Sequence, residues 1–193
     1  MTPLHEVIIN NKTTINPVWI MRQAGRYLPE FKEIRKKNPN FIELCLNHKL
    51  SSEITLQPIK RFDLDAAIIF SDILMLPYGL NQKVDFKKNF GPVLGNLDIG
   101  TMSKIDEIDF VEKIYPVYKA IKSVSLEMTS KNKNTIGFVG APWTLLVYMI
   151  NQQSPKKNVK KDFFEDDFLI NRILLLIEKF LKIHIKNQIE NGA

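Results

Sequence analysis

Asp65-Ala-Ala-Ile-Ile-Phe70 is the stretch of this sequence that decides the fold. It is a short, continuous apolar run between charged and turn residues, which predicts a strand buried on both faces, as in a parallel sheet. A second run, Thr135-Ile-Gly-Phe-Val139, has the same character. Helical patterns separate the two runs and follow the second one. Strands that alternate with helices predict βαβ units, and therefore an α/β fold with a parallel sheet.

Helical patterns account for most of the remaining chain. Proline is favourable at the first helical position, so Pro3, Pro29 and Pro142 predict helix starts. The patterns predict helices over residues 3–9, 29–37, 41–62, 108–128, 142–150 and 168–190, and either short excursions or a hairpin at 84–86 and 90–94. Because proline lacks the backbone N–H, we expect Pro58 to bend or break the 41–62 helix. We expect Pro116 to mark a break or a first turn within residues 108–128.

The composition is that of a soluble globular protein, with 45% hydrophobic and 25% charged residues. At 193 residues the chain is long enough for one domain, residues 1–193, with a sizeable core. The lone Cys45 excludes an internal disulfide and fits a reducing compartment. Glu6 interrupts the N-terminal segment early, which argues against a secretory signal. The longest uncharged run, 136–153, is too rich in polar residues, Gly and Pro to span a membrane. We therefore expect a cytoplasmic protein with no membrane partner.

The net charge of +6 raises the question of a nucleic-acid partner. The lysines are scattered, however, with only small clusters such as those at 36–37, 87–88 and 156–161. A nucleic-acid binder would need basic residues interleaved with aromatic ones, or a helix-turn-helix pattern, and the sequence shows neither. We therefore expect no nucleic-acid partner and interpret the lysines as solvated surface. A positive field would still raise the local concentration of an anionic small molecule.

The stretch Pro17-Val-Trp-Ile-Met-Arg-Gln-Ala-Gly-Arg-Tyr-Leu-Pro-Glu30 carries the strongest chemical signal. An extended apolar run leads into a loop that presents Arg22 and Arg26 around Gly25. The chain has five arginines against 22 lysines, and two of the five lie four residues apart here. A guanidinium binds carboxylate or phosphate through two parallel hydrogen bonds, which lysine cannot do. The pair therefore indicates an anion site, although composition alone favours arginines that cap helix ends or cover the protein surface.

This stretch resembles the N-terminal signature of the uroporphyrinogen decarboxylase family, which acts in haem biosynthesis. Three further stretches resemble the same family, in its order and at plausible spacing: Phe70-Ser-Asp-Ile-Leu-Met-Leu-Pro77, Phe90-Gly-Pro-Val93 and Gly137-Phe-Val-Gly-Ala-Pro-Trp-Thr-Leu145. Together they form a specific signal that runs from Thr2 to the last residue. The resemblance implies decarboxylation of the four acetate side chains of uroporphyrinogen III to give coproporphyrinogen III. It implies no cofactor and no metal, because the substrate, a polycarboxylate tetrapyrrole, supplies its own electron sink.

The resemblance also implies a (β/α)₈ barrel, of which this chain would be only a part. Such a barrel typically needs about 250 residues, and the sequence predicts only two central strands before a last helix. We therefore expect the N-terminal half of a TIM-like barrel, and a homodimer for the complete enzyme. The family also binds substrate through a serine or threonine and a histidine that would lie beyond Ala193. Half of the cleft wall is then absent, so activity of this chain alone is an open question.

Asp72 is the residue that the resemblance places at the centre of the chemistry. It directly follows the first predicted strand, where α/β barrels build their active sites. From the residues alone, a functional carboxylate among apolar neighbours and an N-cap of the next helical turn are equally good interpretations. The resemblance implies that Asp72 accepts hydrogen bonds from the pyrrole N–H groups and stabilises the protonated pyrrole. It implies that Arg22 and Arg26 bind acetate or propionate groups, and that one of them helps to deliver a proton.

Four further residues complete the expected substrate site. Gln23, Ala24 and Gly25 offer backbone amides in the same loop, and Gly25 allows a conformation that other residues resist. Tyr148 matches a family tyrosine that hydrogen-bonds a substrate carboxylate, although its apolar neighbours by themselves favour a core position. Other aromatic residues are interpreted as packing (Trp19, Trp143) or as either packing or cleft lining (Tyr27, Phe31).

Two other functions stay open at this point. Corrinoid-linked methyltransferases of the same superfamily bind zinc through late His and Cys ligands, and they usually lack the loop with the two arginines. A non-enzyme alternative is a truncated remnant that binds anionic porphyrins or nothing. The sequence has no phosphate-binding loop, dinucleotide fingerprint or zinc-protease motif. Its histidines are isolated, and a core or surface position is the better interpretation of His184.

Overall fold

The computed structural model describes residues 1–87, 90–155, 159 and 165–193. Its elements are, in chain order, α1 (Pro3–Ile8), α2 (Pro29–Lys37), α3 (Phe41–Leu46), α4 (His48–Arg61), β1 (Ala66–Ile68), α5 (Met75–Gly79), β2 (Val84–Lys87), β3 (Gly91–Leu94), α6 (Ile99–Met102), α7 (Glu107–Ser130), β4 (Asn134–Ile136), α8 (Pro142–Asn151) and α9 (Asp167–Glu190). None of the helices in these ranges has the length and apolar character needed to cross a bilayer.

The parallel pair of β1 and β4 lies at the centre of the fold. Ala66 pairs with Asn134 and Ile68 with Ile136, and the connection between the two strands includes α7. All three residues of β1 are buried, as expected for a strand covered on both faces. This crossover confirms the predicted α/β class. Of the two alternatives for residues 84–86 and 90–94, the structure shows the hairpin, because β2 and β3 pair antiparallel.

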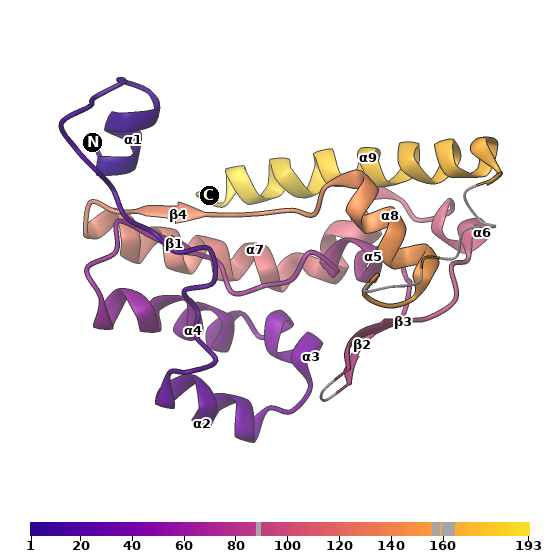
Figure 1. Ribbon diagram of the computed structural model, residues 1–193, viewed down its shortest axis with the longest axis horizontal. Coiled ribbons are helices and arrows are strands. Elements are labelled where there is room, and N and C mark those ends of the chain that lie inside the picture. The colour runs from indigo at the N-terminus through magenta and orange to yellow at the C-terminus, as the bar shows by residue number, and fades with distance from the viewer. Residues whose placement is uncertain (88–89, 156–158, 160–164) are drawn as a thin grey trace.

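Three long helices cover the parallel pair. Figure 1 shows α4, α7 and α9 running alongside it, with α4 nearer β1 and α9 nearer β4. Helix α7 lies between the other two and buries one face completely, with Ile114, Tyr118 and Ile121 all at 0% exposure. On α9, Ile173 and Phe180 are equally buried. Each such side chain contributes roughly 1.5–3 kcal/mol relative to an exposed position, so this interface dominates the core.

Side-chain caps and prolines set where the helices begin. Proline is the first residue of α1, α2 and α8, as predicted. The N-cap side chains of Asn40, Asn47, Asp106 and Asp166 accept hydrogen bonds from backbone N–H groups of the following first turn. These bonds satisfy N–H groups that have no partner within the helix.

Neither proline that the sequence singled out breaks its helix. The predicted 41–62 helix is divided at Asn47 rather than at Pro58, because Asn47 leaves the helical conformation and caps α4 with its side chain. Pro58 lies within the last turn of α4. Pro116 lies inside an uninterrupted α7. A proline inside a helix costs about 3 kcal/mol, which the extensive burial of α7 offsets.

Both central strands are shorter than predicted. The prediction covered residues 65–70 and 135–139, whereas β1 ends at Ile68 and β4 at Ile136. One further hydrogen bond, from Ile69 N–H to Ile136 C=O, follows the ladder. Beyond it the two chains leave the sheet as loops, and these loops position the candidate site.

Candidate active site

A cavity of about 950 Å³ opens at the carboxyl ends of β1 and β4. Pockets that bind small molecules usually have volumes of about 300–1,000 Å³, so this one is large. Its walls come from residues 19–27, from helices α2, α3 and α8, from the loops after β1 and β4, and from the β2–β3 hairpin. The charged side chains in its lining are Arg22, Arg26 and Asp72. The cavity therefore carries two positive charges against one carboxylate.

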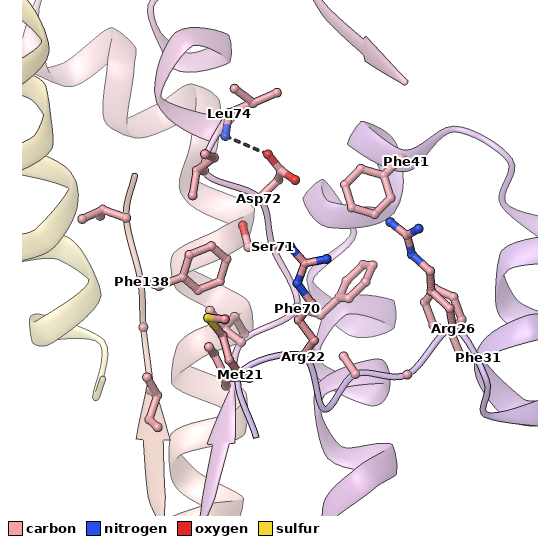
Figure 2. Close-up of a pocket in the computed structure, with 18 of the residues that line it drawn as sticks. Met21, Arg22, Arg26, Phe31, Phe41, Phe70, Ser71, Asp72, Leu74 and Phe138 are labelled. Carbon is pink, nitrogen blue, oxygen red and sulfur yellow. Dashed lines mark hydrogen bonds between the residues drawn. The ribbon is translucent and has the colours of Figure 1, made fainter. Parts of the chain in front are cut away.

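Arg22 and Arg26 lie on one loop, which we call the arginine loop (residues 22–26). Both side chains are exposed, and both line the cavity. Neither guanidinium makes a hydrogen bond or an ion pair with any residue that the structure describes. Figure 2 shows the two side chains rising from the same loop toward the end of the cavity where Asp72 lies. Their donors are therefore available to an anion in the cavity.

Asp72 follows β1 after four residues and is partly buried. Its Oδ1 accepts a hydrogen bond from the backbone N–H of Leu74 at 2.9 Å, which Figure 2 marks as a dashed line. Burial among apolar neighbours raises the pKa of Asp72 from 3.8 to about 6, and the Leu74 hydrogen bond opposes this rise. A carboxylate in this setting interacts strongly with any cation or N–H donor that enters the cavity.

The structure brings six of the seven predicted site residues to this cavity. Ala24, Gly25 and Tyr148 line it together with the two arginines and Asp72. The Tyr148 hydroxyl lies 3.4 Å from Ser154 Oγ, and its ring comes from α8. Gln23 is different: its side chain is only 2% exposed and points away into the protein. Its backbone N–H donates to Ile20 C=O, so the amide that we expected to face a substrate already has a partner.

Comparison with known proteins identifies the family. The sequence model of uroporphyrinogen decarboxylase matches residues 1–193. The uroporphyrinogen decarboxylase of Campylobacter jejuni is 42% identical over 185 residues, covering 94% of this chain and 54% of the relative. That of Rickettsia canadensis is 44% identical over 179 residues, covering 92% of this chain and 52% of the relative. This chain belongs to the uroporphyrinogen decarboxylase family. It spans about half the length of these relatives.

A solved structure supports the fold assignment. A methyltransferase from Methanosarcina mazei superposes with a TM-score of 0.64 at 16% identity, over 83% of this chain and 48% of that protein. At this identity the likeness concerns the fold alone. It therefore gives no support to the methyltransferase alternative.

Sequence reasoning missed an aromatic wall of the cavity. Phe41 lies 4.5 Å from Phe86 and 5.6 Å from Phe70 between ring centroids, and Phe31 lies 5.8 Å from Phe70. All four rings line the cavity. They come from four separate segments, so only the tertiary structure brings them together. Phe31 both packs and lines the cavity, which covers the two alternatives that the sequence left open.

Trp19 corrects another expectation. We interpreted it as packing, yet 40% of its surface is exposed and it lines the cavity. The sequence feature that could have indicated this is the position of Trp19, three residues before Arg22 in the stretch that resembles the family signature. Ser71, next to Asp72, also lines the cavity and was not predicted as a site residue.

Within the described ranges, no group of three or more His, Cys, Asp or Glu side chains is arranged to hold a metal ion. His184 is buried at 5% exposure, its Nδ1 lies 2.9 Å from the Tyr118 hydroxyl, and it is not among the residues that line the cavity. Of the core and surface positions that the sequence left open for His184, the structure shows the core position. The expectation that the reaction needs no cofactor stays a prediction.

Proposed function

We propose that this chain is the N-terminal portion of a uroporphyrinogen decarboxylase. The complete enzyme would remove CO₂ from the four acetate side chains of uroporphyrinogen III and give coproporphyrinogen III. One observation carries the proposal: two guanidinium groups without partners in the described structure share a large apolar cavity with one half-buried aspartate. A polycarboxylate tetrapyrrole combines anionic arms with an apolar ring and N–H donors, and each of these has a complementary group in the cavity.

In this proposal Arg22 and Arg26 bind the carboxylates of the side arms. Each planar guanidinium can donate two parallel hydrogen bonds to one carboxylate. Because both arginines come from one short loop, they can hold two arms of the same macrocycle, or one arm and a second group beside it. Tyr148, on the α8 side of the cavity, would donate its hydroxyl to another carboxylate. The aromatic wall would contact the macrocycle itself.

Asp72 would act on the pyrrole ring that reacts. At pH 7, a pKa of about 6 leaves this carboxylate mostly ionised, so it can accept hydrogen bonds from pyrrole N–H groups. Protonation of a pyrrole carbon makes the ring cationic, and the nearby Asp72 carboxylate stabilises that charge. The electron pair of the breaking C–C bond then enters the ring as CO₂ leaves, which gives an exocyclic methylene. A proton added to this methylene carbon, with loss of the proton from the ring carbon, gives the methyl group and restores the pyrrole. The substrate itself serves as the electron sink.

We further propose a (β/α)₈ barrel, a cytoplasmic location and a homodimer for the complete enzyme, without nucleic-acid partners. Residues 1–193 would form the N-terminal part of this barrel as one unit. The parallel β1–β4 pair with helices alongside supports this arrangement, as does the coverage of about half of each relative. Sedimentation analysis of a complete relative measures the oligomeric state.

The test is an anaerobic assay with uroporphyrinogen III, followed by chromatography of the fluorescent oxidised products. Two proteins are compared: the 193-residue chain, and a fusion of this chain to the C-terminal half of the Campylobacter jejuni relative. We expect the fusion to form products with seven to four carboxylates. Absence of such products from a fusion that folds like the parent relative would contradict the proposal.

Two variants of the fusion separate binding from chemistry. Asp72→Asn keeps an acceptor for the Leu74 N–H but removes the charge, so we expect kcat to fall at least about a hundredfold with a smaller change in KM. Arg22→Ala should mainly raise KM, by about tenfold or more, because it removes a charge-assisted hydrogen bond. Turnover of Asp72→Asn at the parental rate would refute the role assigned to Asp72.

A further inference from the structure

The segment that leads into the arginine loop is weakly packed. Residues 18–23 lie beside β1 without forming part of its sheet. Val18, Ile20 and Met21 are each more than half exposed, so apolar burial does little to fix this segment. At its beginning, Val18 N–H donates to Asp65 Oδ2 at 2.6 Å and Asp65 N–H donates to Val18 C=O at 2.8 Å. These bonds hold the start of the segment but not the arginine loop.

Gln23 supplies the attachment at the other end. Its Nε2 donates to the Ala66 C=O at 3.0 Å, and Ala66 is the first residue of β1. Its Oε1 accepts a hydrogen bond from Ile20 N–H at 3.2 Å, and its own backbone N–H donates to Ile20 C=O at 3.1 Å. Gln23 is the only residue of the arginine loop whose side chain bonds to β1 within the described structure. The amide group is almost fully buried, where such bonds contribute most.

The position of Gln23 connects β1 to both arginines. Arg22 precedes it directly, and Arg26 follows three residues later in a short loop that closes with Leu28 N–H donating to Gly25 C=O. Asp72 belongs to the loop after the same strand. An attachment of the arginine loop to β1 therefore also sets the distance between the guanidinium groups and the Asp72 carboxylate.

We propose that Gln23 is a positioning residue that holds the arginine loop against β1 and so places Arg22 and Arg26 for carboxylate binding. This inference rests on the proposed function for the identity of the anion. It replaces the expectation that Gln23 itself contacts the substrate. Gln23 acts through Arg22 and Arg26 and touches no reacting atom.

The first experiment needs no ligand. Hydrogen exchange is measured across residues 18–28 of the 193-residue chain and of its Gln23→Leu variant. The matched control is Gln82→Leu, because Gln82 is also 2% exposed and its Nε2 donates to the C=O groups of Gly95 and Met149. None of these three residues lines the cavity. We expect Gln23→Leu to accelerate exchange in residues 18–28 about tenfold, and Gln82→Leu to leave it unchanged.

The second experiment tests whether Gln23 acts through Arg22. Dissociation constants for the fluorescent octacarboxylate uroporphyrin III are measured for the chain and for Arg22→Ala, Gln23→Leu and their double variant. We expect each single change to weaken binding about tenfold and the double variant to be little weaker than Arg22→Ala alone, since coupled residues are not additive. Gln82→Leu should leave the dissociation constant within about twofold of the parent, because its residue lies outside the cavity.

Fully additive effects, or unchanged exchange in residues 18–28 of Gln23→Leu, would overturn the inference. Equal loss of affinity in Gln82→Leu would overturn it too, because the effect would then reflect general destabilisation. If neither the parent chain nor its fusion to the C-terminal half of the Campylobacter jejuni relative binds uroporphyrin III, the proposed function fails. The exchange measurement then decides by itself whether Gln23 holds the loop.

Discussion

Asp72 contributes to the local backbone as well as to the cavity. Its Oδ1 accepts the Leu74 N–H and so supports the turn before α5, but the N-cap of α5 is Leu74, so the capping interpretation of Asp72 is not confirmed. Its other oxygen has no hydrogen-bond partner among the described residues and remains for a ligand. The same residue thus stabilises the local backbone and brings a charge into an apolar cavity. A buried charge of this kind should be visible in the stability of the protein.

The free energy of unfolding of the chain should depend on pH, because the ionised form of Asp72 is unfavourable in the folded state. The pKa of Asp72 is higher in the folded chain (about 6) than its ordinary value of 3.8. The folded state therefore binds this proton more tightly, and the resulting stability is present below pH 3.8 and lost as the pH rises to about 6. Each pKa unit corresponds to about 1.4 kcal/mol, which gives up to about 3 kcal/mol in total.

The free energy of unfolding of Asp72→Asn, relative to that of the parent, should therefore rise by up to about 3 kcal/mol from pH 4 to pH 8. Urea unfolding measures it. Asp98→Asn is the matched control, because hydrogen bonds from Thr101 lower the pKa of Asp98. A lowered pKa affects stability only below about pH 3.8, so the stability of Asp98→Asn relative to the parent should stay nearly constant between pH 4 and pH 8. An unchanged difference between Asp72→Asn and the parent across this pH range would contradict the raised pKa.

Catalysis by the fusion enzyme should follow the same titration. In the proposed mechanism Asp72 must be ionised to stabilise the pyrrole cation, so kcat/KM should fall about tenfold per pH unit below pH 6. A pH–rate profile measures this limb, and a profile that stays flat down to pH 5 would show that Asp72 ionises at a lower pH or that its charge is dispensable.

At the scale of the elements, α7 and α9 illustrate what the sequence could predict. Their apolar periodicity predicted the ends of both helices almost correctly, because a long buried face produces a clear pattern in the sequence. The pattern could not show that Pro116 lies inside an uninterrupted helix, since the burial that offsets its cost is a tertiary effect. The strands were predicted too long for a similar reason. An apolar sequence does not tell where the sheet ends and where the wall of a cavity begins.

The buried contact between Tyr118 of α7 and His184 of α9 makes this interface sensitive to acid. Burial lowers the pKa of His184 from 6.5 to about 4. The folded state therefore disfavours the protonated ring, and stability is full above pH 6.5 and falls as the pH drops toward 4. At pH 5 the loss amounts to about 2 kcal/mol.

Replacing both partners, as in Tyr118→Phe with His184→Phe, should remove this acid-dependent component. We compare the free energies of unfolding of the parent and the double variant at pH 7.5 and pH 5. The double variant should gain about 2 kcal/mol on the parent over this interval. Tyr118→Phe alone keeps His184 buried, so it should retain the parent's pH dependence. Equal pH dependence of the parent and the double variant would contradict a buried neutral His184.

At the scale of the whole molecule, the sequence predicted the charged part of the site better than its apolar part. The arginine loop, Asp72 and Tyr148 are far apart in the chain, yet Arg22, Arg26, Asp72 and Tyr148 line one cavity. Asp72 follows a predicted strand, so its place at this end of the sheet follows from the predicted topology. Arg22, Arg26 and Tyr148 were expected at the same site because of the resemblance to the family. The aromatic wall does not follow from the topology, because a phenylalanine in a helix or strand looks the same whether it faces the core or a cavity.

The most direct test of the account is a titration of the 193-residue chain with uroporphyrin III. It compares the parent with two double variants of equal charge change, Arg22→Ala/Arg26→Ala in the cavity and Lys36→Ala/Lys37→Ala at the exposed end of α2. We predict that the arginine variant binds at least about tenfold more weakly and that the lysine variant stays within about twofold of the parent. Equal losses in both variants, or none in either, would contradict a cavity built to bind the carboxylates of a tetrapyrrole.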